Sequence, residues 1–306
     1  MNVLEAAGLS KRFRRTWALR DCTLAIPAGH VVALVGPNGA GKTTLLHLAV
    51  GLTPATAGRV TVLDGEAAGS PTALDRVAFV AQDAPLYRNL SAADMLHLTR
   101  NLNRRWDQGR AEARLAELEI PLKRKVGKLS GGQQAQLALT LALARRPDLL
   151  ILDEPLARLD PLARHDFLAS LMAAVAEDGL SVVFSSHVVS ELERVADYLV
   201  VLSRGRVQVA GEVEELLAGH RLLTGPAGKA EEVAERLPLV RARHAQRQAQ
   251  LLVRAGRGDP VPDGFRAQQV SLEELVLAYL REPTAAALPG PVAQAIQGAG
   301  AGPVTT

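Results

Sequence analysis

Short apolar runs alternate with helical patterns along the first two thirds of the chain. Four runs rich in Val, Ile, Leu and Phe are typical of buried strands and cover residues 30–35, 76–81, 149–153 and 181–185. Helical periodicity lies between most of them. This alternation predicts an α/β fold with a mainly parallel sheet covered by helices, and it places ligands at the carboxyl ends of the strands.

One long segment departs from the alternation. Between about residues 83 and 147 the pattern is helical only, with Ala, Leu, Glu and Arg dominating residues 111–119 and 135–145. We therefore expect a helical subdomain inserted into the sheet domain.

The last third carries a different pattern. Residues 198–202 and 206–210 flank Ser203, Arg204 and Gly205, which predicts a hairpin with a three-residue loop. Beyond Gly219 we expect a helix over 229–237, two strands before Gly256, and a last helix over 272–281 that begins with a capping box of Ser271 and Glu274. The chain then divides into a domain of residues 1–218 and a small α+β extension of residues 219–282. Residues 283–306 carry no charged side chain, and we expect a disordered tail there.

Composition and charge narrow the class of protein. The chain has 306 residues, of which 48% are hydrophobic and 22% charged, which excludes a chain disordered throughout. The net charge of +3 does not single out nucleic acid as a partner. The single cysteine, Cys22, cannot form an internal disulfide, and we expect it to be a small buried side chain in a reducing cytosol. No signal peptide is visible, and no apolar run approaches the ~18 residues of a membrane span.

The strongest chemical signal is a glycine-rich loop between a predicted strand and a predicted helix over residues 44–50. Its sequence, Gly-Pro-Asn-Gly-Ala-Gly-Lys-Thr at 36–43, matches the phosphate-binding loop. Glycines let backbone N–H groups turn toward phosphates, and the helix N-terminus adds partial positive charge. Lys42 would reach the β- and γ-phosphates, and Thr43 would supply a hydroxyl to Mg²⁺.

Two carboxylates follow the apolar run 149–152. Asp153 would hold Mg²⁺ directly or through water, and Glu154 would polarise the attacking water as general base. Taken alone, an Asp-Glu pair after a strand is more often a helix N-cap. The phosphate-binding loop makes the functional interpretation the better one.

A third motif, Leu-Ser-Gly-Gly-Gln at 129–133, precedes a helical run that we expect to begin near Gln134. Ser130 is a good N-cap residue in the ordinary interpretation. In the functional interpretation its hydroxyl, the glycine N–H groups and the helix end form a second anion site, too far along the fold to reach the chain's own phosphate loop.

Together these motifs resemble those of the ATP-binding cassette (ABC) family over roughly residues 2–218. The resemblance adds Gln82 as the Q-loop glutamine, Asp160 in the D-loop and His187 as the switch histidine. It implies the fold of a P-loop NTPase cassette: a mainly parallel sheet core, an antiparallel β part and an inserted helical subdomain, here with a small α+β C-terminal extension.

The resemblance also implies a role for each matched residue. Glu154, His187 and Gln82 would be catalytic, and Thr43, Gln82 and Asp153 would hold Mg²⁺. Phe13 would stack on adenine, with Trp17 close by as an alternative and core packing as the ordinary role of either ring. ATP would be bound by Phe13, Gly36, Pro37, Asn38, Gly39, Ala40, Gly41, Lys42, Thr43, Thr44, Ser130, Gly131, Gly132, Gln133 and Asp160.

The function implied is that of a transport ATPase. The chain would hydrolyse ATP in the cytoplasm, on the inner face of the cell membrane, docked on separately encoded integral membrane permease subunits. Because Ser130 would act in trans, we expect pairing with a second copy or a similar cassette subunit. The form of the phosphate loop and the segment 271–277 favour an exporter of the ABC-2 type, and importers share the same core.

A cassette ATPase acting on ribosomes or nucleic acid is the competing class, and a phosphoryl-transferring kinase is a third. Lys42 and Asp153 are only 111 positions apart with no heptad run between them, and one cassette is present, so no nucleic-acid partner is expected. The motif at residues 129–133 has no role in a kinase. Two departures from the family pattern, Gln134-Ala135-Gln136 after the signature and Ala157-Arg158 before Asp160, bear on turnover and coupling more than on ATP binding.

Overall fold

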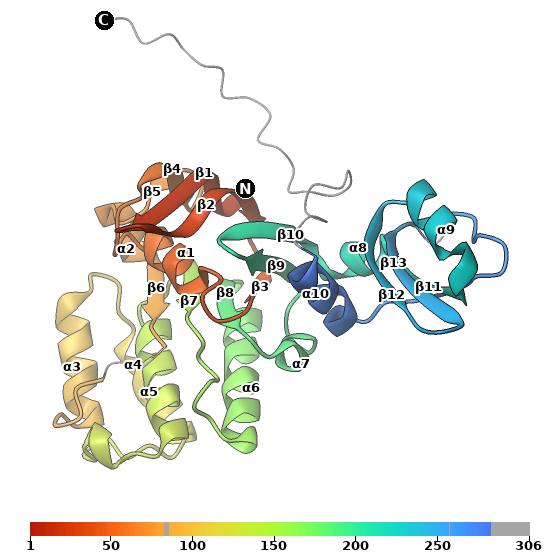
Figure 1. Ribbon diagram of the computed structural model, residues 1–306. Coiled ribbons are helices and arrows are strands. Elements are labelled where there is room, and N and C mark those ends of the chain that lie inside the picture. Colours follow the sequence, from red (N-terminus) through yellow and green to blue (C-terminus); the bar gives the residue numbers. More distant parts are fainter. Residues whose placement is uncertain (83–85, 257, 283–306) are drawn as a thin grey trace, which may run out of the picture.

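The computed structural model describes residues 1–82, 86–256 and 258–282, and Figure 1 shows their arrangement. The segment 283–306, for which the sequence predicts disorder, lies outside the described residues. No helix in the described ranges is long and apolar enough to cross a membrane.

A six-stranded sheet forms the centre of the molecule, in the order β10-β9-β3-β8-β7-β6. Five of its strands run parallel, and β10 pairs antiparallel with β9. The strands are β3 (Val31–Val35), β6 (Val77–Val80), β7 (Leu149–Leu152), β8 (Ser181–Ser186), β9 (Tyr198–Ser203) and β10 (Arg206–Glu212). The four predicted strands are confirmed to within one or two residues, because continuous apolar runs suit strands covered on both faces.

An antiparallel sheet of order β2-β1-β4-β5 covers one side of the central sheet. Its strands are β1 (Asn2–Phe13), β2 (Thr16–Pro27), β4 (Ala57–Val62) and β5 (Glu66–Ala67), and the helices beside it are α1 (Lys42–Ala49) and α2 (Pro71–Arg76). Side chains of both sheets and of α1 share one apolar core, which includes Leu24, Leu46 and Val200. Cys22 lies in this core and is buried, as expected.

The inserted segment is helical, as predicted. It contains α3 (Ala92–Leu102), α4 (Gln108–Glu117), the 3₁₀ helix η1 (Val126–Lys128) and α5 (Gly131–Leu143), with a core of its own around Leu96, Leu115 and Leu137. On the other face of the central sheet, α6 (Pro161–Asp178) and α7 (Val189–Leu192) pack against a second core that includes Phe167 and Phe184.

The hairpin between β9 and β10 has a two-residue turn, so the predicted three-residue loop is wrong. Ser203 pairs with Arg206 inside the strand ladder. Arg204 and Gly205 both have positive φ, at 49° and 72°, which is the backbone of a type I′ turn.

The C-terminal extension is a four-stranded antiparallel sheet of order β12-β13-β11-β14 with helices on both faces. The helix α8 (Val213–Ala218) comes directly before it. The extension's own elements are β11 (His220–Pro226), η2 (Ala227–Lys229), α9 (Ala230–Arg236), β12 (Leu239–His244), β13 (Gln248–Arg254), β14 (Arg266–Gln268) and α10 (Leu272–Arg281). The sequence predicted α9, β12, β13 and α10 and missed the other elements.

The helix α10 joins the extension to the rest of the molecule. It contacts β12 of the extension as well as β9 and α7 of the central domain (Figure 1). Leu275, Val276 and Tyr279 of α10 belong to the same apolar core as Leu192 and Leu216. The proposed division at residue 218 stays a prediction, since this core extends across it.

Candidate nucleotide site

Four predicted site segments lie at one edge of the central sheet. The glycine loop follows β3, Gln82 follows β6, Glu154 follows β7 and His187 follows β8. These strands are parallel and adjacent in the order β3-β8-β7-β6, so their carboxyl ends meet at one edge. The topology therefore gathers residues that are up to 151 positions apart in the chain.

The glycine loop has a backbone that side chains would disrupt. Gly39 and Gly41 have φ of 80° and 107°. A Cβ at Gly36 would meet the carbonyl oxygen of Leu202 at 2.2 Å, and one at Gly41 would meet that of Ala18 at 2.6 Å. At Gly36 and Gly41 the loop lies so close to β9 and β2 that there is room for backbone alone. Its turn brings the first N–H groups of α1 to the sheet edge, where anions are favoured.

Lys42 and Glu154 form an ion pair at the centre of this edge. The Nζ atom of Lys42 lies 3.3 Å from Oε1 of Glu154 and donates to the carbonyl oxygen of Gly36 at 2.8 Å. The other carboxylate oxygen of Glu154 lies 3.2 Å from Nδ1 of His187. Lys42 is buried, while His187 is half exposed. Lysine, glutamate and histidine thus form one connected group, as a phosphate-binding and water-activating site requires.

A buried serine, which the sequence analysis missed, holds both carboxylate residues in place. The Oγ of Ser185 donates to Oδ1 of Asp153 at 2.7 Å and accepts from the backbone N–H of Glu154 at 2.8 Å. Asp153 and Ser185 are 1% and 0% exposed. Glu154 has a φ of 46°, a sparsely populated conformation for a residue with a side chain, and this hydrogen bond helps to hold it. The Ser185-Ser186 pair at the end of an apolar strand was the available signal.

The donors present fit Mg²⁺ bound beside a nucleotide. Asp153 offers a buried carboxylate, and Thr43 stands in the first turn of α1, so both supply the oxygen ligands that Mg²⁺ prefers. Gln82 is exposed after β6. It makes no hydrogen bond within the described residues, so its predicted metal and catalytic roles stay predictions.

The signature segment has the geometry of an ordinary helix cap. Leu129 belongs to the core of the helical insertion, whereas Ser130 and Gly131 are exposed. Ser130 Oγ accepts from the backbone N–H of Gln133, and Gln133 Oε1 accepts from that of Ser130. This capping box starts α5 at Gly131, so the predicted start near Gln134 is wrong. A Cβ at Gly131 would be nearest the carbonyl oxygen of Arg158, so the signature adjoins the segment before α6. Its role as a second anion site stays a prediction.

The residues of α5 that depart from the family pattern make hydrogen bonds to neighbouring segments. Gln134 donates to the carbonyl oxygen of Leu129 at 2.9 Å. Gln136 is buried and donates to Ser170 Oγ at 3.3 Å, which links α5 to α6. Asp160 caps α6 by accepting from the backbone N–H of Ala163 at 2.9 Å. Gln136 thus links the signature helix to the neighbouring helix α6. Asp160 is the residue matched to the D-loop, and its nucleotide-binding role stays a prediction.

The two candidate adenine-stacking rings are both exposed. Phe13 and Trp17 flank the β1–β2 turn and are 50% and 42% exposed, so core packing does not account for either. Lys11 Nζ lies 5.0 Å from the centre of the Phe13 ring, and Arg12 lies over the Trp17 ring at 5.6 Å. The stacking role of Phe13 stays a prediction.

Comparison with known proteins decides the family. The sequence pattern of the ABC transporter family matches residues 19–157. A solved ATP-binding subunit of an ABC transporter superposes with a TM-score of 0.62 at 30% identity, covering 70% of this chain and 91% of that one. The chain belongs to the ABC transporter family. It is an ATP-binding subunit, or cassette, of that family of transport ATPases, with the predicted cassette fold.

Two further relatives bear on the function of the cassette. The sulfate/thiosulfate import ATP-binding protein CysA of Xanthomonas campestris is 36% identical over 209 residues, covering 65% of this chain and 61% of that protein. A cassette solved as a dimer in a post-hydrolysis state bound to ADP and Pi has a TM-score of 0.61 and 26% identity, covering 69% of this chain and 98% of that one. The chain spans less than two thirds of the length of the curated relatives that it matches, 61% for this CysA and 64% for that of Mesorhizobium japonicum.

Proposed function

We propose that the cassette binds and hydrolyses ATP to drive import through separately encoded membrane subunits. One observation carries the proposal: Glu154 stands between the phosphate-loop lysine and His187, beside the buried carboxylate of Asp153. This group combines a phosphate-binding cation, an oxygen ligand for a metal and a general base at one sheet edge.

Each residue of this group has a role that follows from its chemistry. The N–H groups of the glycine loop and the ammonium of Lys42 bind the phosphates, and Lys42 exchanges its Glu154 partner for them. The freed carboxylate of Glu154 accepts the proton of the attacking water. His187 donates to the γ-phosphate from the ring that contacts Glu154. A Mg²⁺ ion held by Thr43 and Asp153 would neutralise phosphate charge as it develops.

The complete site requires a second subunit in this proposal. Ser130 and Gly131 are exposed at the start of α5 in the helical insertion, whereas the glycine loop packs against β9 and β2. The solved relative described as dimeric and bound to ADP and Pi supports such an assembly. The serine-glycine corner of one cassette would then contact the phosphates on Lys42 of its partner.

A groove at the base of the helical insertion suits a membrane partner. It lies between the end of β6 and helices α3 and α5, and its walls are mostly apolar, with Phe79, Leu86, Met95 and Leu141 among them. Ala81, the residue before Gln82, also lines the groove. A partner seated here would move with the insertion as the nucleotide site opens and closes.

The proposed direction of transport differs from the direction expected from the sequence. The resemblance favoured export and left import open, whereas the CysA relatives are named as sulfate/thiosulfate import proteins. We therefore propose import. In vesicles that carry the whole complex with the cassettes and ATP on the inside, accumulation of substrate in the lumen would support import. ATP-driven depletion of the lumen would contradict it.

A Glu154→Gln variant tests the hydrolytic proposal. The amide cannot accept a proton, so ATP hydrolysis should fall by about 10² to 10⁴-fold. ATP binding should persist, because the loop and Lys42 are unchanged. Phosphate release and equilibrium nucleotide binding measure the two effects separately.

Glu191→Gln is the matched control. Glu191 is also a poorly exposed carboxylate near His187, yet it pairs with Arg164 at 2.6 Å. This variant should hydrolyse ATP at close to the unmodified rate. Normal hydrolysis by the Glu154→Gln variant would remove Glu154 from the role of general base.

A further inference from the structure

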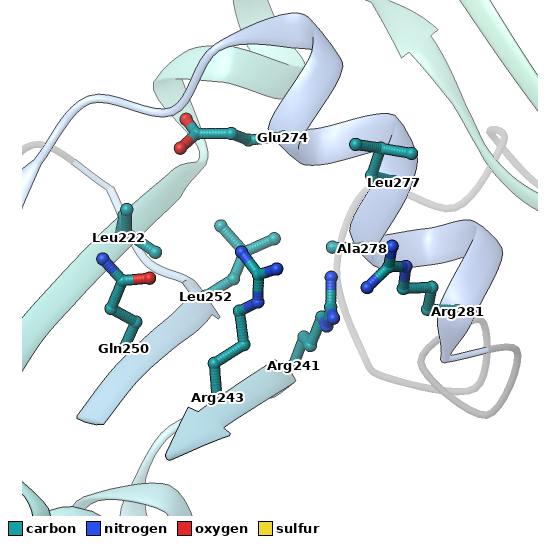
Figure 2. A pocket seen from close by; sticks show the side chains of 9 residues that line it. All are labelled: Leu222, Arg241, Arg243, Gln250, Leu252, Glu274, Leu277, Ala278 and Arg281. Carbon is teal, nitrogen blue, oxygen red and sulfur yellow. The ribbon is translucent and has the colours of Figure 1, made fainter. Parts of the chain in front are cut away.

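A pocket in the C-terminal extension gathers three arginines around an apolar floor. It lies between α10 and one face of the sheet and has a cavity volume of about 80 Å³ (Figure 2). Arg241, Arg243 and Arg281 point toward the space between the helix and the sheet. Leu222, Leu252, Leu277 and Ala278 supply apolar walls.

The strand register explains why these side chains meet. Arg241 pairs with Leu252, which also pairs with Leu222, and Arg243 pairs with Gln250. Directly paired residues share one face of a sheet, and alternate residues of a strand do too. Arg281 is the last residue of α10, which packs over this face.

The arginine cluster has little carboxylate to balance it. None of the three arginines forms an ion pair within 4.0 Å in the part of the chain that the structure describes. Glu274 lines the pocket, but its Oε2 accepts from the backbone N–H and the hydroxyl of Ser271 in the helix cap. The residues after Glu282 contain no acidic side chain.

The three like charges of the cluster repel one another, although Arg243 and Arg281 are exposed and Arg241 is partly exposed. Burial lowers the pKa of Arg241, the charges of Arg281 and Arg243 lower it further, and Glu282 opposes them. Like charges held together in this way favour a bound anion, because it relieves the repulsion and accepts charge-assisted hydrogen bonds. Arginine forks match planar or tetrahedral oxyanions better than other cations do.

We propose that this pocket binds a small organic anion, a phosphate-type oxyanion carried on a short apolar body. The three guanidinium groups hold the oxyanion, and the leucine walls take the apolar part. The cavity volume admits a ligand of only a few heavy atoms beyond the oxyanion. The site is separate from the nucleotide site, and its occupation does not depend on the proposed transport function.

Binding of n-butyl phosphate and of inorganic phosphate, each titrated calorimetrically against a chloride control of equal ionic strength, tests the proposal. Both titrations use full-length protein carrying Lys42→Ala, which weakens phosphate binding at the glycine loop. Saturable binding of butyl phosphate, several-fold tighter than that of inorganic phosphate, is expected. Equal or tighter binding of inorganic phosphate would overturn the organic part of the proposal and leave a free oxyanion as the ligand.

Variants of the pocket arginines test where butyl phosphate binds. Arg241→Gln combined with Arg243→Gln should weaken butyl phosphate binding at least tenfold. Arg236→Gln should leave it unchanged, because Arg236 belongs to α9, which packs on the other face of the sheet, and pairs with Glu232. Unchanged binding in the double variant would overturn the proposal.

A charge reversal covers the case in which the double variant folds poorly. Arg243→Glu places a carboxylate beside Arg241 and Arg281, so it should raise the melting temperature of the free protein and abolish butyl phosphate binding. A lower melting temperature together with retained binding would contradict the role of the cluster.

Discussion

At the scale of single residues, the orientation of Glu154 depends on Ser185. The serine hydroxyl contacts both Asp153 and the backbone of Glu154, and it is fully buried. A hydroxyl in this position links the Asp153 carboxylate to the backbone of Glu154, so we expect Ser185 to act as a positioning residue.

Replacing Ser185 with alanine should therefore affect stability and activity together. The buried N–H of Glu154 and the carboxylate of Asp153 each lose a partner, which should destabilise the fold by about 1–3 kcal/mol. Hydrolysis should fall by roughly 10 to 100-fold, because small misplacements of catalytic groups are costly. Chemical denaturation and phosphate release measure the two effects.

Ser181→Ala is the control for this prediction. Ser181 is a buried serine of the same strand, and its Oγ accepts from the N–H of Gly29 at 2.8 Å, at the far end from the site. The Ser181→Ala variant should be destabilised by a comparable amount and should hydrolyse ATP at the unmodified rate. Equal losses of activity in both variants would mean that Ser185 acts only through stability.

A buried histidine links the extension to the domain before it. His220 Nδ1 donates to the carbonyl oxygen of Leu216 at 2.6 Å, so its Nε2 accepts from the Tyr279 hydroxyl at 2.8 Å. Tyr279 also accepts from Arg254 Nε at 2.8 Å. This network suits a neutral imidazole, because Nε2 then accepts from the hydroxyl, whereas a second ring proton would place a buried positive charge near Arg254.

Stability should consequently fall in acid. Burial is the main cause of the lowered pKa of His220; Arg254 lowers it further, and the bond to Leu216 opposes them. The unfolded chain then binds the proton more readily, so the stabilisation is complete above the unfolded-state pKa of about 6.5 and is lost as pH falls toward the folded-state value.

Thermal unfolding between pH 5 and 8 measures this dependence. His220→Gln should flatten the slope, whereas His244→Gln should retain it, because His244 is exposed at the end of β12. A slope that persists in the His220 variant would assign the effect to another group.

At the scale of elements, the loop between β3 and α1 depends on glycine for two separate reasons. Gly39 and Gly41 both have positive φ, but only Gly41 is also crowded, since its Cβ would meet Ala18 and Leu19. A Cβ at Gly39 would meet nothing within 4 Å.

Two alanine variants separate strain from crowding. Gly39→Ala should cost about 1–2 kcal/mol, the penalty for left-handed backbone. Gly41→Ala should cost more and should also abolish ATP binding, because relief of the clash moves the start of α1. Denaturant unfolding and nucleotide titration are the measurements, and equal effects of the two variants would show that crowding is unimportant.

Much of the element pattern could be predicted because it is local. The phosphate loop, the four apolar strands and α10 with its capping box each depend on neighbours in sequence. The start of α5 was misplaced because two glycines mask a capping box. The strand β11 was missed because its partners β13 and β14 lie 22 or more positions further along the chain.

Contacts between distant segments could not be predicted. The bonds of Ser185 to Asp153 and Glu154 span 32 and 31 positions, and they exist because β7 and β8 are neighbours in the sheet. The cluster of Arg241, Arg243 and Arg281 likewise depends on how α10 crosses the sheet. Neither arrangement leaves a periodic signal in the sequence.

At the scale of the whole molecule, α10 connects the extension to the nucleotide site. It packs against α7, which begins two residues after His187, and against the strands β9 and β12. Movement of the extension would therefore reach α7, directly after His187, the predicted switch histidine.

We propose that the hydrolytic site is shared between two copies of the chain. Lys42→Ala removes the cation that binds the phosphates, and Ser130→Arg blocks the signature motif. Each variant alone should therefore fail to hydrolyse ATP. In a mixed dimer, the Lys42 of one chain meets the Ser130 of the other, which restores one of two sites.

Phosphate release from an equal mixture of the two variants tests this claim most directly. If the copies assort at random, the mixture should recover up to about a quarter of the unmodified rate, well above the sum of the separate variants. A mixture no more active than that sum, in a preparation shown to exchange subunits, would contradict the shared site.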